Sequence, residues 1–202
     1  NMRLIFSPAS PFVRKVNVMV HEAGLRERIT LTSVQTTALN TSPDALAANP
    51  LGKIPALILE DGRTLIDSRV ICRFLDDLSG ASLYASDRLW DVLTLEALAD
   101  GIMESGVAIS YEARLRPEAE RSADWVAAQW NKISHALEAL DAKTFVAMDG
   151  DLNMGQLALG CALGYLDFRH GSRNWRSGKP ALSAWYDAIS TRASMVATQP
   201  AV

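Results

Sequence analysis

Short apolar runs alternate with segments of helical periodicity at the start of the chain. The runs Arg3–Phe6 and Ile29–Val34 have the apolar and β-branched character of strands. Between them, apolar residues recur at helical spacing over residues 12–20, after the helix-start pair Ser10-Pro11 and before the helix-ending Gly24. The pattern predicts a strand, a helix and a second strand. A right-handed crossover makes these two strands parallel.

The next segment adds a short helix and a hairpin. Ser42-Pro43 is a second helix-start signal. Ala56–Glu60 and Thr64–Ile66 flank Asp61-Gly62, which favours a tight turn between two antiparallel strands. A further helix, opened by Ser68, carries on one face the apolar residues Val70, Ile71, Phe74, Leu75 and Leu78. The predicted order β-α-β-α-β-β-α over residues 1–78 is that of a thioredoxin-type domain.

The rest of the chain has helical periodicity and no convincing strand. Residues 78–87 lack any period, and we interpret them as a linker. The expected helices span residues 87–115, 117–140, 153–168 and 181–191. The third is apolar nearly all round and should be buried, with Asn153 as its N-cap and Gln156 at the third position of a capping box. The tail beyond Ser194 is weakly patterned.

Together these patterns predict an α/β plus all-α protein. A thioredoxin-like N-terminal domain over residues 1–78 precedes an all-helical domain over residues 87–202. With 49% hydrophobic and 21% charged residues, the chain can bury cores of this size. The formal net charge of −3 argues against a nucleic-acid partner, because proteins that bind nucleic acids usually carry a basic excess.

The number of cysteines and the hydropathy of the chain indicate the cellular compartment of the protein. Cys72 and Cys161 are too few for a disulfide framework, and both lie in apolar, helix-like stretches, so we expect buried free thiols. We expect no secretory signal and no membrane-spanning segment, since no apolar stretch has the required length. A cytoplasmic location fits these features. No cluster of cysteine, histidine and acidic residues indicates a metal site.

The pair Ser10-Pro11 is the first motif that could carry chemistry. A hydroxyl at a helix N-terminus, directly after a strand, faces free backbone N–H groups and the positive end of the helix dipole. An enzyme can hold a thiolate or a phosphate there. Ser7, at the end of the strand, is a second candidate hydroxyl. Ordinary helix capping also accounts for Ser10, so this motif alone leaves both interpretations open.

Two further motifs could bind a small peptide-like ligand. A cis Ile54–Pro55 bond before a strand would offer the backbone N–H and C=O of Ile54 to an extended ligand. Lys53 could pair with a ligand carboxylate or remain solvated. Asp67 and Ser68, at a helix N-terminus, could hold the ammonium and the carboxylate of an amino acid, or could simply cap that helix.

These motifs and the element order resemble the cytosolic glutathione S-transferase family over nearly the whole chain. The strongest stretches are Ser10-Pro11-Phe12-Val13-Arg14-Lys15, Asn49-Pro50-Leu51-Gly52-Lys53-Ile54-Pro55, Asp67-Ser68-Arg69-Val70-Ile71 and Glu96-Ala97-Leu98-Ala99-Asp100-Gly101-Ile102-Met103. The chain is most similar to small bacterial members that have Ser-Pro-Phe-Val at the first helix. The resemblance implies that the first domain binds glutathione as a co-substrate and that the helical domain contributes the site for a small electrophile.

Ser10 matches the position of the family's catalytic serine. The resemblance implies that it donates a hydrogen bond to the sulfur of glutathione and is not itself the nucleophile. Lowering the thiol pKa by two units from about 8.5 needs about 2.7 kcal/mol of preferential thiolate stabilisation. A hydroxyl donor together with a helix N-terminus is adequate in kind and size.

The other glutathione contacts are also implied by the resemblance. Ile54 precedes the family's cis-proline, here Pro55, and would bind the cysteinyl backbone of glutathione. Lys53 would lie near the glycyl carboxylate. Asp67 and Ser68 would hold the γ-glutamyl group, although many members have a glutamate where Asp67 stands, so the acid here is one methylene shorter.

We expect the electrophile to bind in a cleft between the first helix and the long helix over residues 87–115. The candidate residues are Phe12, Glu104, Tyr111 and Arg114. Helical spacing places Glu104 and Tyr111 on one face. Gly101 and Gly106 lower helix propensity and indicate close backbone approach, as at a cleft wall or a dimer seam.

The resemblance implies a homodimer, with Asp100 near the seam and within reach of the partner's glutathione site. Two functions stay open. One is an enzyme for glutathione conjugation, as in detoxification, or for glutathione-dependent peroxidase, dehalogenase or isomerase chemistry. The other is a non-catalytic interaction module that keeps the fold and loses the site. The joint presence of Ser10, Lys53, Ile54-Pro55 and Asp67-Ser68 favours the enzyme.

Overall fold

A four-stranded mixed sheet forms the first half of the protein, whose computed structural model describes all 202 residues. The strands are β1 (Met2–Phe6), β2 (Ile29–Ser33), β3 (Ala56–Ile58) and β4 (Thr64–Leu65). They lie in the order β2-β1-β3-β4. β2 runs parallel to β1, whereas β3 is antiparallel to both β1 and β4. The parallel pair and the hairpin that the sequence predicts are therefore confirmed.

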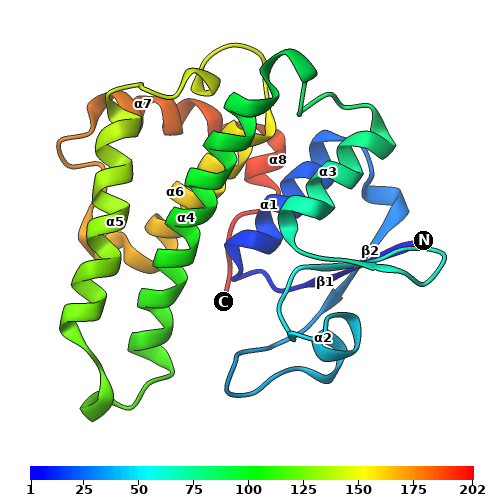
Figure 1. Cartoon of the computed structure of the whole chain (residues 1–202), viewed down its shortest axis with the longest axis horizontal. Helices are drawn as coiled ribbons and strands as arrows, with labels where there is room; N and C mark the ends of the chain where they lie inside the picture. The colour runs from blue at the N-terminus through cyan, green and yellow to red at the C-terminus, as the bar shows by residue number, and fades with distance from the viewer.

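Helices cover the sheet and make up the rest of the chain (Figure 1). They are α1 (Pro11–Glu22), α2 (Pro43–Ala48), α3 (Ser68–Ser79), α4 (Leu89–Arg114), α5 (Ala123–Asp141), α6 (Met154–His170), α7 (Pro180–Ile189) and α8 (Ala193–Val196). α1 and α3 lie on one face of the sheet and α2 lies on the other, while α4 to α7 form a helical bundle beside them. This is the predicted thioredoxin-like half followed by a helical half.

Alternation along the strands divides the core between the two faces of the sheet. Leu4 and Leu57 are fully buried in the main hydrophobic cluster, which also takes in α1, α3 and the bundle. Their neighbours Ile5 and Ala56 point the other way, into a small cluster under α2. α6 is buried nearly all round, as its composition predicts. The sheet is thus packed on both faces although it has only four strands.

Two local details differ from the sequence expectations. α5 begins at Ala123 and not near 117, because the Ser122 hydroxyl accepts a hydrogen bond from Trp125 N at 3.1 Å and caps the helix there. Pro117 precedes a separate 3₁₀ turn, Glu118–Glu120. Asn153 caps α6, because its side chain accepts a hydrogen bond from Gln156 N. The reciprocal bond of a capping box, from the Gln156 side chain to the Asn153 backbone, does not form, since Gln156 Nε2 donates to the carbonyl of Ala147 at 3.0 Å.

The tail is more ordered than its weak pattern predicts. Residues after Ser190 form α8 and pack along α1, and Met195 is fully buried in the main cluster. A helix of four residues is too short to show a period, so only contacts distant in sequence reveal it. None of the helices combines the length and the apolar character that crossing a bilayer requires.

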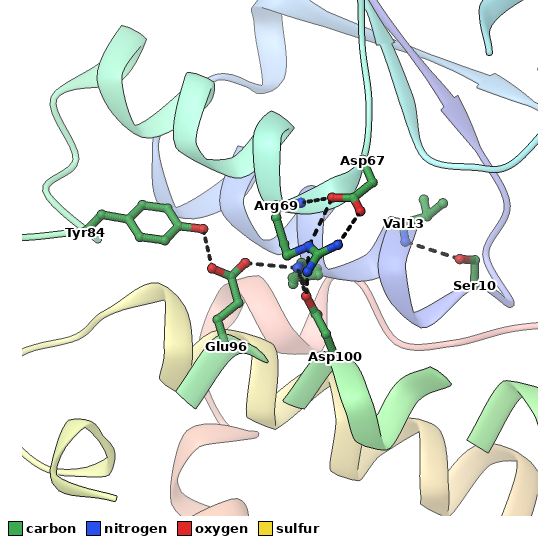
Figure 2. Close-up of polar contacts among 8 residues, drawn as sticks. Ser10, Val13, Asp67, Arg69, Tyr84, Glu96 and Asp100 are labelled. Carbon is green, nitrogen blue, oxygen red and sulfur yellow. Dashed lines mark hydrogen bonds and ion pairs between the residues drawn. The ribbon is translucent and has the colours of Figure 1, made fainter. Parts of the chain in front are cut away.

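A buried ion cluster joins α1 to α4. Lys15 on α1 is fully buried, and its Nζ lies 2.9 Å from Glu96 Oε2 and 2.9 and 3.0 Å from the two oxygens of Asp100. Tyr84 donates to the other oxygen of Glu96 at 2.8 Å (Figure 2). Burial by itself would lower the pKa of Lys15, but attraction by Glu96 and Asp100 outweighs it and raises that pKa. The ammonium therefore stays charged inside the protein.

Replacing Lys15 with methionine tests how much the fold depends on this cluster. Lys15→Met keeps the volume but leaves two carboxylates buried without their cation. The free energy of unfolding should fall by about 3–5 kcal/mol, the usual result of breaking a buried ion pair on one side. Urea denaturation followed by circular dichroism measures the change. The matched control Lys132→Met, at an exposed position on α5, should stay within about 0.5 kcal/mol of wild type. Equal stability of both variants would show that the cluster does not hold the fold.

Candidate functional site

The fold brings the three sequence motifs to one end of the sheet. Antiparallel pairing sets Ala56 opposite Ile5, so the preceding Pro55 lies beside Phe6, where β1 ends. Leu65 pairs with Leu57, so Asp67 leaves β4 at the same end. The loop that carries Ser7 and Ser10 also begins there. Motifs separated by more than forty residues thus meet because β1 and β4 end where β3 starts.

Ser10 is the N-cap of α1. Its Oγ accepts a hydrogen bond from Val13 N at 3.2 Å, and its carbonyl accepts from Arg14 N at 3.0 Å (Figure 2). The hydroxyl is half-buried, and its own proton has no acceptor within the chain. Capping uses a lone pair of the oxygen and leaves the O–H free to donate. The two interpretations of Ser10 from the sequence are therefore chemically compatible.

Ser7 lies on the same turn as Ser10. Its carbonyl accepts from Ser10 N at 3.3 Å, and its half-buried hydroxyl makes no hydrogen bond within the chain. A cavity of about 80 Å³ lies beside it, between this loop and the segment that follows α8. Both hydroxyls therefore remain candidates for contact with a ligand at this end of the sheet.

The loop before β3 is organised by a buried asparagine. Asn49 Nδ2 donates to the carbonyl of Lys53 at 3.0 Å, and its Oδ1 accepts from Leu51 N at 3.0 Å. The Ile54–Pro55 bond is cis, as the sequence analysis anticipated. Ile54 is half-buried, and the exposed Lys53 ammonium makes no ion pair within the chain. The Ile54 backbone and the Lys53 side chain are thus presented at the edge where the motifs meet.

Asp67 and Ser68 open α3. Asp67 accepts from Arg69 N at 2.9 Å and pairs with the Arg69 guanidinium at 2.8 Å. The hydrogen bonds from Arg69 hold the pKa of the Asp67 carboxyl below its usual value, so Asp67 is an anion at neutral pH. Ser68 is buried, and its hydroxyl makes no hydrogen bond within the chain. An exposed carboxylate and a free hydroxyl therefore stand together at a helix N-terminus.

Arg69 connects this position to the buried ion cluster, and the sequence analysis assigned it no role. Its Nε lies 4.0 Å from Asp100 Oδ2, and Figure 2 shows its side chain between Asp67 and Asp100. The sequence analysis also gave Lys15 no role and named it only within the stretch Ser10–Lys15 that resembles the family. The four-residue spacing of Glu96 and Asp100 was the available signal, since it puts both carboxylates on one face of a helix.

Asp100 lies within the cluster of its own chain, and its reach to a partner's glutathione site stays a prediction. Asp100 is 4% exposed, and both its oxygens are bound by Lys15 of the same chain. Burial raises the pKa of its carboxyl, against the opposing attraction of Lys15. Both carboxylate oxygens of Asp100 therefore already bind a cation of the same chain.

The electrophile candidates are less well defined by the structure. Glu104, Tyr111 and Arg114 are exposed on α4 and make no side-chain hydrogen bond or ion pair, while Phe12 is half-buried on α1 and packs against the main cluster. A Cβ on Gly106 would lie 3.2 Å from the Tyr165 ring, so Gly106 does mark a close approach, between α4 and α6. A Cβ on Gly101 would meet no atom within 4 Å, so no other segment of the chain approaches the α4 backbone closely at Gly101, contrary to the expectation.

Known proteins are similar to this chain in sequence and in fold. Two family models match the chain, the N-terminal domain of glutathione S-transferase at residues 9–78 and the C-terminal domain at residues 123–188. An uncharacterized GST-like protein of Escherichia coli, YibF, is 33% identical over 98% of both chains.

A glutathione transferase family member from Pseudomonas fluorescens is 42% identical and has been solved with two ligands. With bound glutathione its TM-score is 0.96, and with bound S-(propanoic acid)-glutathione it is 0.91; each match covers 100% of both chains. Together with the two matched family models, these relatives establish that the chain belongs to the glutathione S-transferase family.

Proposed function

We propose that the protein is a glutathione transferase, which activates glutathione as a thiolate for attack on a small electrophile. The observation that carries this proposal is the meeting of a free serine hydroxyl, the Ile54–Pro55 backbone and the Asp67 carboxylate at one end of the sheet. The Pseudomonas relative with bound glutathione supports it, because its fold superimposes over the whole chain.

Thiolate stabilisation is the central step of the proposed reaction. At neutral pH a free thiol with a pKa near about 8.5 is mostly protonated. The Ser10 hydroxyl donates to the sulfur while its oxygen accepts from Val13 N, and the N-terminal dipole of α1 adds a favourable field. The serine stays chemically unchanged, and the sulfur attacks the electrophile.

The remaining residues hold the tripeptide in an extended form. Asp67 receives the γ-glutamyl ammonium, and the Ser68 hydroxyl with the α3 N-terminus receives the γ-glutamyl carboxylate. The backbone of Ile54 pairs with the cysteinyl residue, and Lys53 lies near the glycyl carboxylate. Because Arg69 keeps Asp67 ionised, this contact does not depend on a proton near neutral pH.

The electrophile occupies the space between α1 and the exposed face of α4 that bears Glu104, Tyr111 and Arg114, with Phe12 on the α1 side. Conjugation is favoured over the other glutathione-dependent reactions by the relative solved with S-(propanoic acid)-glutathione, since that ligand is itself a glutathione thioether. A thiol-disulfide route is disfavoured, because Cys72 and Cys161 are both buried in helices. Buried free thiols also fit a cytoplasmic location.

A non-catalytic interaction module is the alternative function. Such a module keeps the fold without the site. Retention of the protein on immobilised glutathione, and its release by free glutathione, separates the two functions, because only an intact site recognises the tripeptide.

Asp67→Ala should weaken glutathione binding by about 1.5–3 kcal/mol, or roughly ten- to 150-fold in Kd, because a charge-assisted hydrogen bond is lost. Isothermal titration calorimetry measures this affinity. Asp61→Ala is a matched control: Asp61 accepts from Arg63 N at 3.0 Å and pairs with the Arg63 guanidinium at 2.8 Å, but it lies in the β3–β4 turn. Unchanged affinity in Asp67→Ala would remove this residue from the site.

Ser10→Ala should raise the pKa of bound glutathione by about one unit, equivalent to about 1.4 kcal/mol. The effect should be smaller than the loss of an oxyanion-hole donor, because the helix N-terminus remains. Thiolate absorbance titrated against pH measures it. Ser42→Ala removes an equivalent cap, from α2, and should leave the curve in place. If Ser7→Ala shifts the curve and Ser10→Ala does not, the strand-end hydroxyl is the donor.

We also propose a homodimer. Trp90 and Leu51 are 77% and 72% exposed, and apolar side chains of this size at the surface suit an interface. Multi-angle light scattering at micromolar concentration should give twice the chain mass of 22.0 kDa. A mass near 22.0 kDa under these conditions would contradict the dimer.

A further inference from the structure

The segment that follows α7 runs back along α1 and ends beside the β1–α1 loop. In Figure 1 the red end of the chain passes the blue α1 and stops near its first turn. The backbone N–H of Ala201 donates to the carbonyl of Pro8 at 3.2 Å. Pro8 lies between Ser7 and Ser10, so this segment touches the loop that carries both candidate hydroxyls.

Arg14 ties the same segment to the first turn of α1. Only 6% of Arg14 is exposed; its Nη2 donates to the carbonyl of Met195 at 3.0 Å and its Nε to Thr198 Oγ1 at 3.3 Å. Thr198 in turn donates to the carbonyl of Ser194 at 2.8 Å. A Cβ on Gly164 would lie 2.5 Å from Arg14 Nη1, so the guanidinium occupies space that only glycine leaves on α6.

The segment is also attached at the far end of α1. Arg192 binds both oxygens of Glu22 at 2.9 Å, and the Ser194 hydroxyl donates to the same carboxylate at 2.6 Å. These hydrogen bonds lower the pKa of the Glu22 carboxyl and keep it ionised. Contacts at both ends and in the middle therefore hold the segment along α1, in the antiparallel direction.

Hydrogen bonds join the segment to the loop and to α1 beside a small cavity. A cavity of about 80 Å³ separates the loop from the segment, lined by Phe6, Ser7, Pro8, Arg14, Thr198 and Gln199. The Ala201 hydrogen bond reaches the loop itself, and the Arg14 hydrogen bonds reach the first turn of α1 directly after it.

We propose that residues 193–201 form a clamp that holds the β1–α1 loop, with Arg14 as the positioning residue that links the clamp to the first turn of α1. The clamp keeps the Ser7 and Ser10 hydroxyls in place at the end of the sheet. Its effect on the thiolate rests on the proposed function, whereas its effect on the loop does not.

Amide hydrogen exchange tests the clamp without any ligand. Thr198→Val removes the acceptor of Arg14 Nε at constant shape, and a chain ending after Pro200 removes the Ala201 contact. In both variants the amides of Ser10 and Val13 should exchange about fivefold faster, as expected for loss of one hydrogen bond. The amides of Ala45 and Leu46, in the equivalent first turn of α2, should not change.

Two matched controls separate the clamp from general weakening. Thr191→Val removes a threonine hydroxyl that bonds only the carbonyl of Ala188, and deletion of Val202 alone leaves Ala201 in place. Both should exchange like wild type at Ser10 and Val13. Arg14→Lys, which keeps the charge and loses the planar fork, should behave like Thr198→Val.

The outcomes are distinct. Unchanged exchange at Ser10 and Val13 in Thr198→Val and in the shortened chain overturns the clamp, as does equal acceleration at Ala45 and Leu46. With glutathione bound, the thiolate pKa should rise in Thr198→Val and stay at the wild-type value in Thr191→Val. Faster exchange without a thiolate shift overturns the positioning role of Arg14. If wild type binds no glutathione, the proposed function fails, and the exchange result still decides the clamp.

Discussion

The ammonium of Lys15 lies inside the protein with no access to water, and much of the arrangement follows from keeping it paired. An unpaired charge in that place would cost about 3–5 kcal/mol, a large share of the net stability of a folded protein. Two carboxylates spaced four residues apart on α4 provide the pairing, and they do so only if α4 lies directly against α1. The cluster therefore sets how the helical half sits on the sheet half. Hydrophobic contacts alone, being non-directional, would set this less sharply.

The same cluster reaches the edge of the proposed binding site. Asp100 binds Lys15 on one side and lies 4.0 Å from Arg69 on the other, and Arg69 holds the Asp67 carboxylate. Asp67 is thus oriented by a chain of charges that begins in the core. An exposed aspartate on a flexible loop would have no such support, and its carboxylate would lose more conformational freedom on binding a ligand.

The sheet supplies the second constraint on the site. With only four strands, the topology brings the end of β1, the start of β3 and the end of β4 to a single edge. Two helices begin at that edge, α1 and α3, and both direct their N-termini toward it. A ligand with two negatively charged ends and a thiol can then use both helix dipoles at once.

Interactions between residues close in sequence account for most of the secondary structure. Ser10, Ser42, Asp67 and Asn153 each cap the helix that the sequence predicts, because an N-cap needs only its own side chain and the next turn. The strands followed from apolar, β-branched runs and turn residues, which also predicted two of the three pairings, β1 with β2 and β3 with β4. The motifs of the site were also visible, although Ser10 and Asp67-Ser68 alone were consistent with plain helix capping and Lys53 with a solvated side chain.

What the sequence left open were contacts between residues far apart in the chain. The pairing of Lys15 with Glu96 and Asp100 spans more than eighty residues, and that of Arg14 with Thr198 spans 184. The link between the end of α1 and the tail is also distant in sequence, since Arg192 pairs with Glu22 across 170 residues. The tail near Met195 becomes ordered only because α1 and α6 are already in place to receive it. Local propensity acts through neighbours in sequence, whereas these contacts exist only once the chain has folded and removed their charges and side chains from water.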